Sequence, residues 1–183
     1  MSDYRIAAIP TVYRGRRYRS RLEARWAAFF DLLGWNHEYE PCDLGSWSPD
    51  FALWGRRPHN PTLVEVKPID RWDRAIARKM ADASANADIT RTVLLLGVAP
   101  DFDDPWVSIG WWGEPGSYEA VWDTALLGTM LDGKFDIQPC GEGDICPQSM
   151  LWEACYDLEP VNAKPLWVQA ANLVQWRGVD ATP

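Results

Sequence analysis

Two stretches of the sequence decide the fold: SPDFALW at residues 48–54 and TLVEVK at residues 62–67. Each is a short, mostly apolar run, and the turn-forming residues 55–61 separate them. This pattern is typical of two β-strands joined as a hairpin. The sequence therefore predicts strands over both stretches, and each strand carries one carboxylate, at Asp50 and at Glu65.

The alternation of side chains predicts which residues of this hairpin share a face. Successive side chains of a strand point to opposite faces, so Asp50 points away from the face of its neighbour Phe51. Glu65 and Lys67 share one face of the second strand, and its valines share the other. Burial of Phe51 against one of those valines sets the register. That register brings Asp50 to the face of Glu65 and Lys67, at the end of the strand pair away from the turn.

Such a group of side chains has a chemical use. Two carboxylates close together repel each other unless a cation joins them, and hard oxygen ligands suit Mg²⁺ or Mn²⁺. A metal held in this way polarises a phosphoryl oxygen and lowers the pKa of a bound water, which phosphodiester hydrolysis requires. Lys67, on the same face, could orient that water or stabilise the charge that develops on the phosphate.

The flanking residues predict the other elements of a core. A helix is expected from Ser20, where Ser20 and Glu23 have the spacing of a capping box, to Gly34, which ends it. Glu23 falls on the margin of the apolar stripe of this helix. The remaining expected elements are strands at 37–40 and 91–98, and a helix that is capped by Asp70 and has a stripe of Trp72, Ile76, Met80 and Ala83. The predicted order is helix, three strands, helix, strand.

The PD motif at residues 49–50 and the EVK motif at residues 65–67, preceded by Glu23, resemble the PD-(D/E)xK nuclease superfamily. The segment RSRLEARWA at residues 19–27 is similar to phage and prophage proteins of this type. The resemblance covers roughly residues 15–98. It implies a restriction-endonuclease-like α/β (α+β) fold, in which helices flank a mixed four-stranded sheet in the order αβββαβ.

The resemblance also implies a role for each residue of the motif. Asp50 and Glu65 would bind Mg²⁺ or Mn²⁺, helped by the main-chain carbonyl of Val66. Lys67 would be catalytic, and Glu23 would assist through the metal or a water. The implied activity is that of an endonuclease that hydrolyses DNA phosphodiester bonds through a metal-activated water. For Glu23 a purely structural part in the capping box stays open as the alternative.

Charge is distributed unevenly along the chain. The net charge is −8, but residues 1–25 hold seven arginines and two acids, a balance of +5, whereas residues 100–160 hold thirteen acids and one lysine, a balance of −12. A basic surface can therefore meet a DNA backbone although the whole chain is acidic. The residues expected to contact DNA beside the site are Arg14, Arg16, Arg17, Arg19 and Arg21. The alternative is that these arginines only form a solvated face.

Beyond residue 100 the composition changes to one rich in acids, Gly, Pro and Trp. We expect a nuclease-like core over residues 1–100, which includes the basic segment, and an elaboration over residues 101–183 that packs on this core. The elements expected in the elaboration are a strand at 106–112 and a helix at 165–176, with Leu166, Leu173 and Val174 facing inward. Because they are neighbours in a strand, Trp111 and Trp112 must point to opposite faces.

Several classes of protein are not expected. The longest apolar run is far shorter than the ~20 residues of a membrane-spanning helix, and the N-terminus has no apolar signal region. Four unevenly spaced cysteines suit neither a disulfide scaffold nor a zinc site. We therefore expect reduced thiols and a cytoplasmic location, which would be a bacterial host's cytoplasm if a phage encodes the protein.

Two functions follow from these observations. The first is a divalent-metal-dependent DNA endonuclease, and within that class a structure-specific enzyme such as a junction resolvase stays open. A resolvase would usually act as a homodimer, because two strands must be cut. The alternative is a non-catalytic binding protein whose acidic C-terminal part mimics nucleic acid and blocks a host DNA-binding or defence protein.

Overall fold

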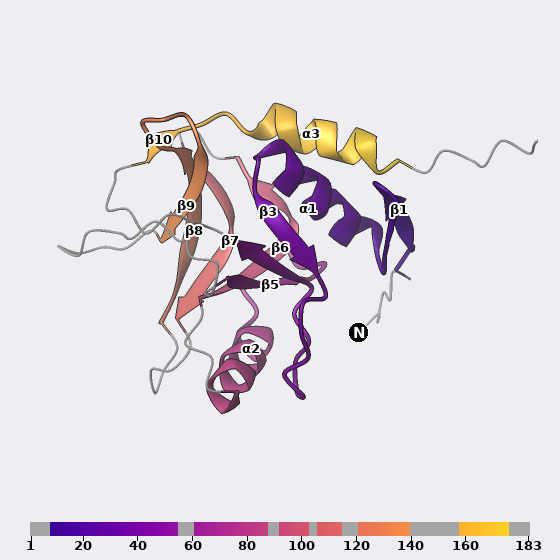
Figure 1. Ribbon diagram of the computed structural model, residues 1–183. Coiled ribbons are helices and arrows are strands. Elements are labelled where there is room, and N and C mark those ends of the chain that lie inside the picture. The colour runs from indigo at the N-terminus through magenta and orange to yellow at the C-terminus, as the bar shows by residue number, and fades with distance from the viewer. Residues whose placement is uncertain are drawn as a thin grey trace, which may run out of the picture.

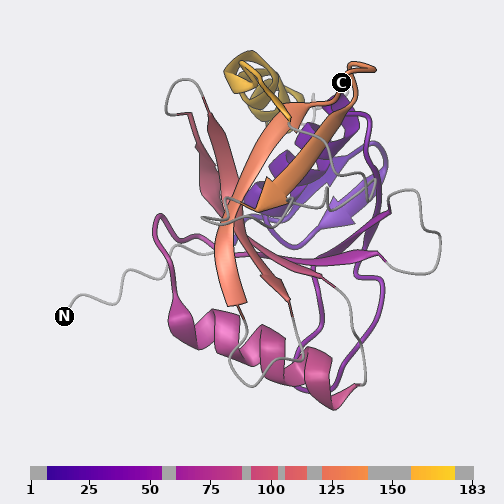
Figure 2. The same ribbon diagram turned by 90° about the vertical axis from the view of Figure 1, so that its left-hand side faces the viewer.

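The computed structural model describes residues 8–54, 61–87, 92–102, 106–114, 121–139 and 158–175. These residues form one large mixed sheet with helices on both of its faces (Figure 1). Helix α1 (Arg21–Leu32) and helix α3 (Lys164–Leu173) lie side by side over one face, and helix α2 (Arg74–Asn86) lies under the other (Figure 2). None of the described helices is both long and apolar enough to cross a bilayer.

The large sheet has eight strands. In chain order they are β3 (Asn36–Tyr39), β4 (Phe51–Trp54), β5 (Thr62–Val66), β6 (Val93–Asp101), β7 (Val107–Glu114), β8 (Val121–Thr129), β9 (Phe135–Pro139) and β10 (Glu159–Pro160). Their order across the sheet is β10-β8-β7-β6-β5-β4-β3, and β9 also pairs with β8. The β5–β6 pair is parallel, and α2 lies in the connection between these two strands. The other pairs are antiparallel.

Each face of the sheet packs against its own helices. Beneath α1 and α3, the apolar core includes Phe51 of β4 and Val64 of β5, in contact with aromatic side chains of α1 such as Phe30. On the opposite face, Met80 of α2 is buried with Leu63 of β5 and neighbouring side chains. Alternate side chains of β4 and β5 therefore belong to two separate cores, one on each face of the sheet. A polar residue on either strand takes the place of an apolar contact in the core on its own face.

Local sequence accounts for both ends of α1. At its start, the Ser20 hydroxyl accepts a hydrogen bond from the backbone N–H of Glu23 at 3.1 Å, which caps the helix as predicted. At its end, Gly34 has a φ of +73°, and its N–H donates to the Asp31 carbonyl. The N–H of Trp35 returns to the Phe30 carbonyl, which completes a Schellman motif. The glycine is required there because other residues rarely adopt this conformation.

The predicted order of helix, three strands, helix and strand is confirmed by α1, β3, β4, β5, α2 and β6. The prediction of a four-stranded sheet was wrong, because β7, β8, β9 and β10 extend the same sheet beyond β6. The strand expected at 106–112 is confirmed as β7, whereas β8, β9 and β10 were not predicted. The boundary expected near residue 100 falls inside β6.

Several element boundaries also differ from the expectation. The second helix is capped by Asp73, whose side chain accepts from two backbone N–H groups, and Asp70 lies outside the helix. Strand β4 begins at Phe51 and not at residue 48. In α3, Val174 is buried after the last turn, but Leu173 is 47% exposed and does not face inward. Trp111 and Trp112 pack on opposite cores, as predicted.

The chain after β5 is held against β6 by a close approach of two backbones. The N–H of Lys67 donates to the Leu96 carbonyl, and the N–H of Val98 donates to the Ile69 carbonyl. Between these two bonds lies Gly97, where an added Cβ would stand 2.5 Å from the Ile69 oxygen. Glycine at this position therefore allows the segment that carries Lys67 to lie against the sheet.

The substitution Gly97→Ala is expected to destabilise the fold by roughly 2–3 kcal/mol, because the methyl group must push the backbone of Ile69 away. Urea denaturation measures the change. The control is Gly133→Ala in the turn after β8, where the φ of +77° is unfavourable but an added Cβ meets nothing within 4 Å. That variant should lose only about 1 kcal/mol. Equal losses in the two variants would contradict this account of Gly97.

Candidate active site

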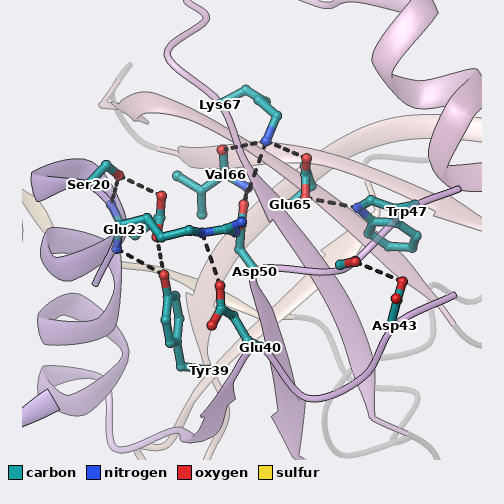
Figure 3. A network of polar contacts seen from close by, with 12 residues as sticks. Ser20, Glu23, Tyr39, Glu40, Asp43, Trp47, Asp50, Glu65, Val66 and Lys67 are labelled. Atoms are coloured by element: carbon teal, nitrogen blue, oxygen red, sulfur yellow. Dashed lines mark hydrogen bonds and ion pairs between the residues drawn. The ribbon is translucent and has the colours of Figure 1, made fainter. Parts of the chain in front are cut away.

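The predicted site residues Asp50, Glu65 and Lys67 meet at one end of the β4–β5 pair (Figure 3). Phe51 is paired with Val64 across the two strands, which is one of the two registers that the sequence allowed. Asp50 therefore stands opposite Glu65 on the face that α2 covers. The argument from side-chain parity is confirmed.

Asp50 is almost wholly buried, with 1% of its surface exposed. Its Oδ2 atom accepts a hydrogen bond from the backbone N–H of Val66 at 2.8 Å and lies 3.8 Å from the Lys67 ammonium. Its Oδ1 atom accepts from the Arg19 guanidinium. Both oxygens of the Asp50 carboxylate thus accept a hydrogen bond, one from β5 and one from the segment before α1.

Glu65 is also buried, with 6% of its surface exposed. Its Oε1 atom pairs with the Lys67 ammonium, and its Oε2 atom accepts a hydrogen bond from the indole N–H of Trp47 at 2.9 Å. Trp47 fixes the direction of the carboxylate, as an outer partner of a metal ligand does. Sequence reasoning missed Trp47, because a single tryptophan in the loop before β4 carries no motif.

The ammonium of Lys67 marks the point on which three oxygens converge. It contacts Glu65 Oε1, lies 3.3 Å from the carbonyl oxygen of Val66 and lies 3.8 Å from Asp50 Oδ2. These are two carboxylates and one main-chain carbonyl, the hard donor set that a small dication prefers. The chemistry of these donors therefore fits Mg²⁺ or Mn²⁺. In this structure the Lys67 ammonium is the cation that lies among them.

Two carboxylates are fewer than a closed protein cage would need. Among the described residues, no group of three or more His, Cys, Asp or Glu side chains that could hold a metal is found. Mg²⁺ is commonly held by one or two carboxylates and keeps several of its waters. A dication between Asp50 and Glu65 would accordingly depend on the Val66 carbonyl and on solvent for its remaining ligands.

Glu23 lies beside this site and has structural partners of its own. Its Oε1 atom accepts from the Ser20 hydroxyl at 2.8 Å, and its Oε2 atom accepts from the Tyr39 hydroxyl at 2.5 Å. Burial, and then the bond to Glu23, raise the pKa of Tyr39 to about 12, so this hydroxyl keeps its proton. Arg19 links Glu23 to Asp50, because its Nε atom lies 3.9 Å from Glu23 Oε2. The expected capping box is formed only in part, since the Glu23 carboxylate does not return to the backbone of Ser20.

The basic segment ahead of α1 is a hairpin that the sequence analysis did not predict. Strand β1 (Thr11–Tyr13) pairs with strand β2 (Arg16–Tyr18) through a tight turn in which Arg14 and Gly15 both have positive φ. Tyr13 and Tyr18 are buried and fix this hairpin to α1. The hairpin therefore belongs to the fold and lies beside α1 (Figure 1).

The five arginines expected to contact DNA are not all gathered at the site. Of the five, Arg19 alone contacts Asp50. Arg14 pairs instead with Asp31, at 3.2 Å, and not with Asp50 or Glu65. The Arg16 guanidinium donates to a backbone carbonyl of β3 at 3.4 Å. The last two, Arg17 and Arg21, are exposed.

The surroundings of Asp50 disfavour its ionised form. Burial and the neighbouring charge of Glu65 raise the pKa of Asp50 to about 7, although Lys67 and the N–H of Val66 act in the opposite direction. A carboxyl group this far from its ordinary pKa gains from any cation that joins it. Strongly perturbed groups of this kind are concentrated at functional sites.

Comparisons of the chain with protein-family models, with curated proteins and with solved structures found no match. Of the four cysteines, Cys140, Cys146 and Cys155 lie outside the described residues, and Cys42 is half-buried.

The raised pKa of Asp50 predicts how stability depends on pH in the metal-free protein. Its folded pKa of about 7 exceeds its ordinary value of 3.8, so Asp50 contributes stability in full below about pH 4. That contribution should decline by at most about 1.4 kcal/mol per pH unit as the pH rises toward 7, and should be lost above it. The measurement is denaturation of wild type and Asp50→Asn in EDTA from pH 4 to 8. Stability curves that run parallel over this range would contradict the shift.

Proposed function

We propose that this protein is a divalent-metal-dependent endonuclease that hydrolyses phosphodiester bonds of DNA. The observation that carries the proposal is the convergence of Asp50, Glu65 and the Val66 carbonyl on the ammonium of Lys67. The choice of DNA as substrate comes from the resemblance of the sequence motif. A structure-specific activity and a homodimer stay predictions within this proposal.

Each polar residue of the site has a role in the proposed reaction. Asp50, Glu65 and the Val66 carbonyl would hold Mg²⁺ or Mn²⁺, and Trp47 would keep the Glu65 carboxylate aimed at it. When bound, the metal supplies a Lewis acid for the phosphate and lowers the pKa of its own water. The protein's part is to fix the ligand oxygens before the substrate arrives, which β4 and β5 do through their shared register.

Lys67 is suited to stabilise the negative charge of the transition state. Its side chain is 37% exposed, in contrast to the buried carboxylates beside it. An ammonium at the exposed rim of the carboxylate pair could donate to a phosphate oxygen or orient the attacking water. The backbone of Lys67 is fixed by its hydrogen bond to Leu96, so the ammonium would have a limited range of positions.

Plasmid cleavage tests the proposal. Wild type is expected to nick supercoiled DNA in Mg²⁺ or Mn²⁺ but not in EDTA. The variants Asp50→Asn and Lys67→Met should each lose at least about 100-fold in rate, because they remove a metal ligand or the charge at the phosphate. The matched controls are Glu38→Gln on β3 and Lys79→Met on α2, both at exposed positions, and both should retain the wild-type rate.

The outcomes separate the proposed enzyme from the alternative function. Cleavage that persists in Asp50→Asn would discard this mechanism. The absence of metal-dependent cleavage on supercoiled and branched DNA, together with a tight complex with a DNA-binding protein, would favour the nucleic-acid mimic. Much of the acidic sequence on which that alternative rests lies outside the described residues.

Arg17 and Arg21 provide a test of how the protein grips DNA. Both are exposed, at the end of the basic hairpin and the start of α1. If each neutralises one phosphate, Arg17→Ala and Arg21→Ala should each reduce the slope of log affinity against log salt by about 1. Fluorescence anisotropy with a labelled duplex in Ca²⁺, between 50 and 300 mM salt as roughly the range where such contacts matter, measures this slope. Slopes equal to that of wild type would mean that these arginines form only a solvated face.

A further inference from the structure

Arg19 lies inside the site and contacts carboxylates from three parts of the chain. Its Nη2 atom donates to Asp50 Oδ1, and its Nε atom lies 3.0 Å from Glu40 Oε1 and 3.9 Å from Glu23 Oε2. Its backbone is held as well, since its N–H donates to the Tyr39 hydroxyl at 3.0 Å. This arginine therefore joins Asp50 to Glu23 of α1 and to Glu40 at the end of β3.

The contact with Arg19 places a second positive charge, besides that of Lys67, on the carboxylate that would hold the metal. Asp50 Oδ2 accepts from the backbone N–H of Val66 and is the oxygen that faces the Lys67 ammonium, and Oδ1 is the other oxygen of the same carboxylate. That atom is the acceptor of the Arg19 guanidinium. A guanidinium on one oxygen and a dication on the other would neutralise the same carboxylate and repel each other at short range.

Arg19 is also able to leave Asp50 without losing all of its partners. Its side chain is 57% exposed, whereas that of Asp50 is 2% exposed. Glu40, with a side chain that is 49% exposed, holds the Nε edge of the guanidinium at the rim of the site. Rotation away from Asp50 can therefore keep the guanidinium near the site, paired with Glu40 and open to solvent.

We propose that Arg19 is an exchangeable counterion, which neutralises Asp50 while the site lacks metal and competes with the dication for it. On metal loading the guanidinium would be released to the rim, where it can pair with a phosphate of the substrate. This inference rests on the proposed function, since it takes Asp50 as a metal ligand. Arg19 is on this account a positioning residue for the metal, in addition to the contact with DNA expected from its charge.

The proposal predicts that removing Arg19 strengthens metal binding. With its competitor absent, Arg19→Ala should bind Mn²⁺ about tenfold more tightly than wild type, which corresponds to the loss of one charge-assisted hydrogen bond. Electron paramagnetic resonance of free Mn²⁺ measures this affinity without any reaction. The matched control is Arg17→Ala, which removes the same charge from an exposed position in β2, two residues before Arg19, and which should change the Mn²⁺ affinity less than twofold.

A second readout distinguishes this role from a merely structural one. Arg19→Ala should bind duplex DNA more weakly than wild type in the presence of Ca²⁺, while its Mn²⁺ affinity rises. Loss of structure would weaken both. Arg19→Met, which keeps most of the apolar stem, gives the same comparison if the alanine variant does not fold.

The outcomes also separate this inference from the proposed function. If wild type binds Mn²⁺ and cuts DNA, but Arg19→Ala and Arg17→Ala have the same Mn²⁺ affinity, the counterion role is wrong and the nuclease proposal stands. If Arg19→Ala binds Mn²⁺ more tightly but no variant cuts DNA, the counterion role stands and the nuclease proposal fails. If neither wild type nor Arg19→Ala binds Mn²⁺ at Asp50, both are wrong.

Discussion

The structure depends on one constraint: two carboxylates are buried opposite each other at the end of β4 and β5. The pairing of Phe51 with Val64 imposes this arrangement, because it commits the apolar residues to one face and leaves Asp50 with Glu65 on the other. Burial of like charges is costly and must be offset by cations or by protons. In the metal-free protein, Lys67 and Arg19 supply the cations. The raised pKa of Asp50 favours its protonated form.

The rest of the fold keeps this constrained pair in place. Strand β5 lies inside the sheet between β4 and β6, so its backbone is paired on both edges. The close contact at Gly97 holds the chain that follows Lys67, and the cap of α1 at Ser20 holds Glu23 beside Tyr39. A site at the ends of such elements is held more precisely than one on loops, which the proposed metal-dependent hydrolase would need.

The sequence predicted the features that follow from periodicity and left out those that depend on distant contacts. The parity of Asp50 and Glu65, the cap at Ser20 and the end of α1 at Gly34 are local, and all three were predictable. The hairpin of β1 and β2 was missed, because its turn places Arg14 in a left-handed conformation that arginine rarely adopts. The contacts of Trp47 and Arg19 were equally hidden, since each joins segments that only the folded chain brings together.

A crystal of the protein grown with Mn²⁺ would test the central claim most directly, through the anomalous scattering of the metal. We expect one Mn²⁺ within bonding distance of a carboxylate oxygen of Asp50, a carboxylate oxygen of Glu65 and the carbonyl oxygen of Val66. In that crystal the Lys67 ammonium should have moved off the point where these oxygens converge. Full occupancy of that point by Lys67 at saturating Mn²⁺, with no anomalous peak between the two carboxylates, would contradict the account.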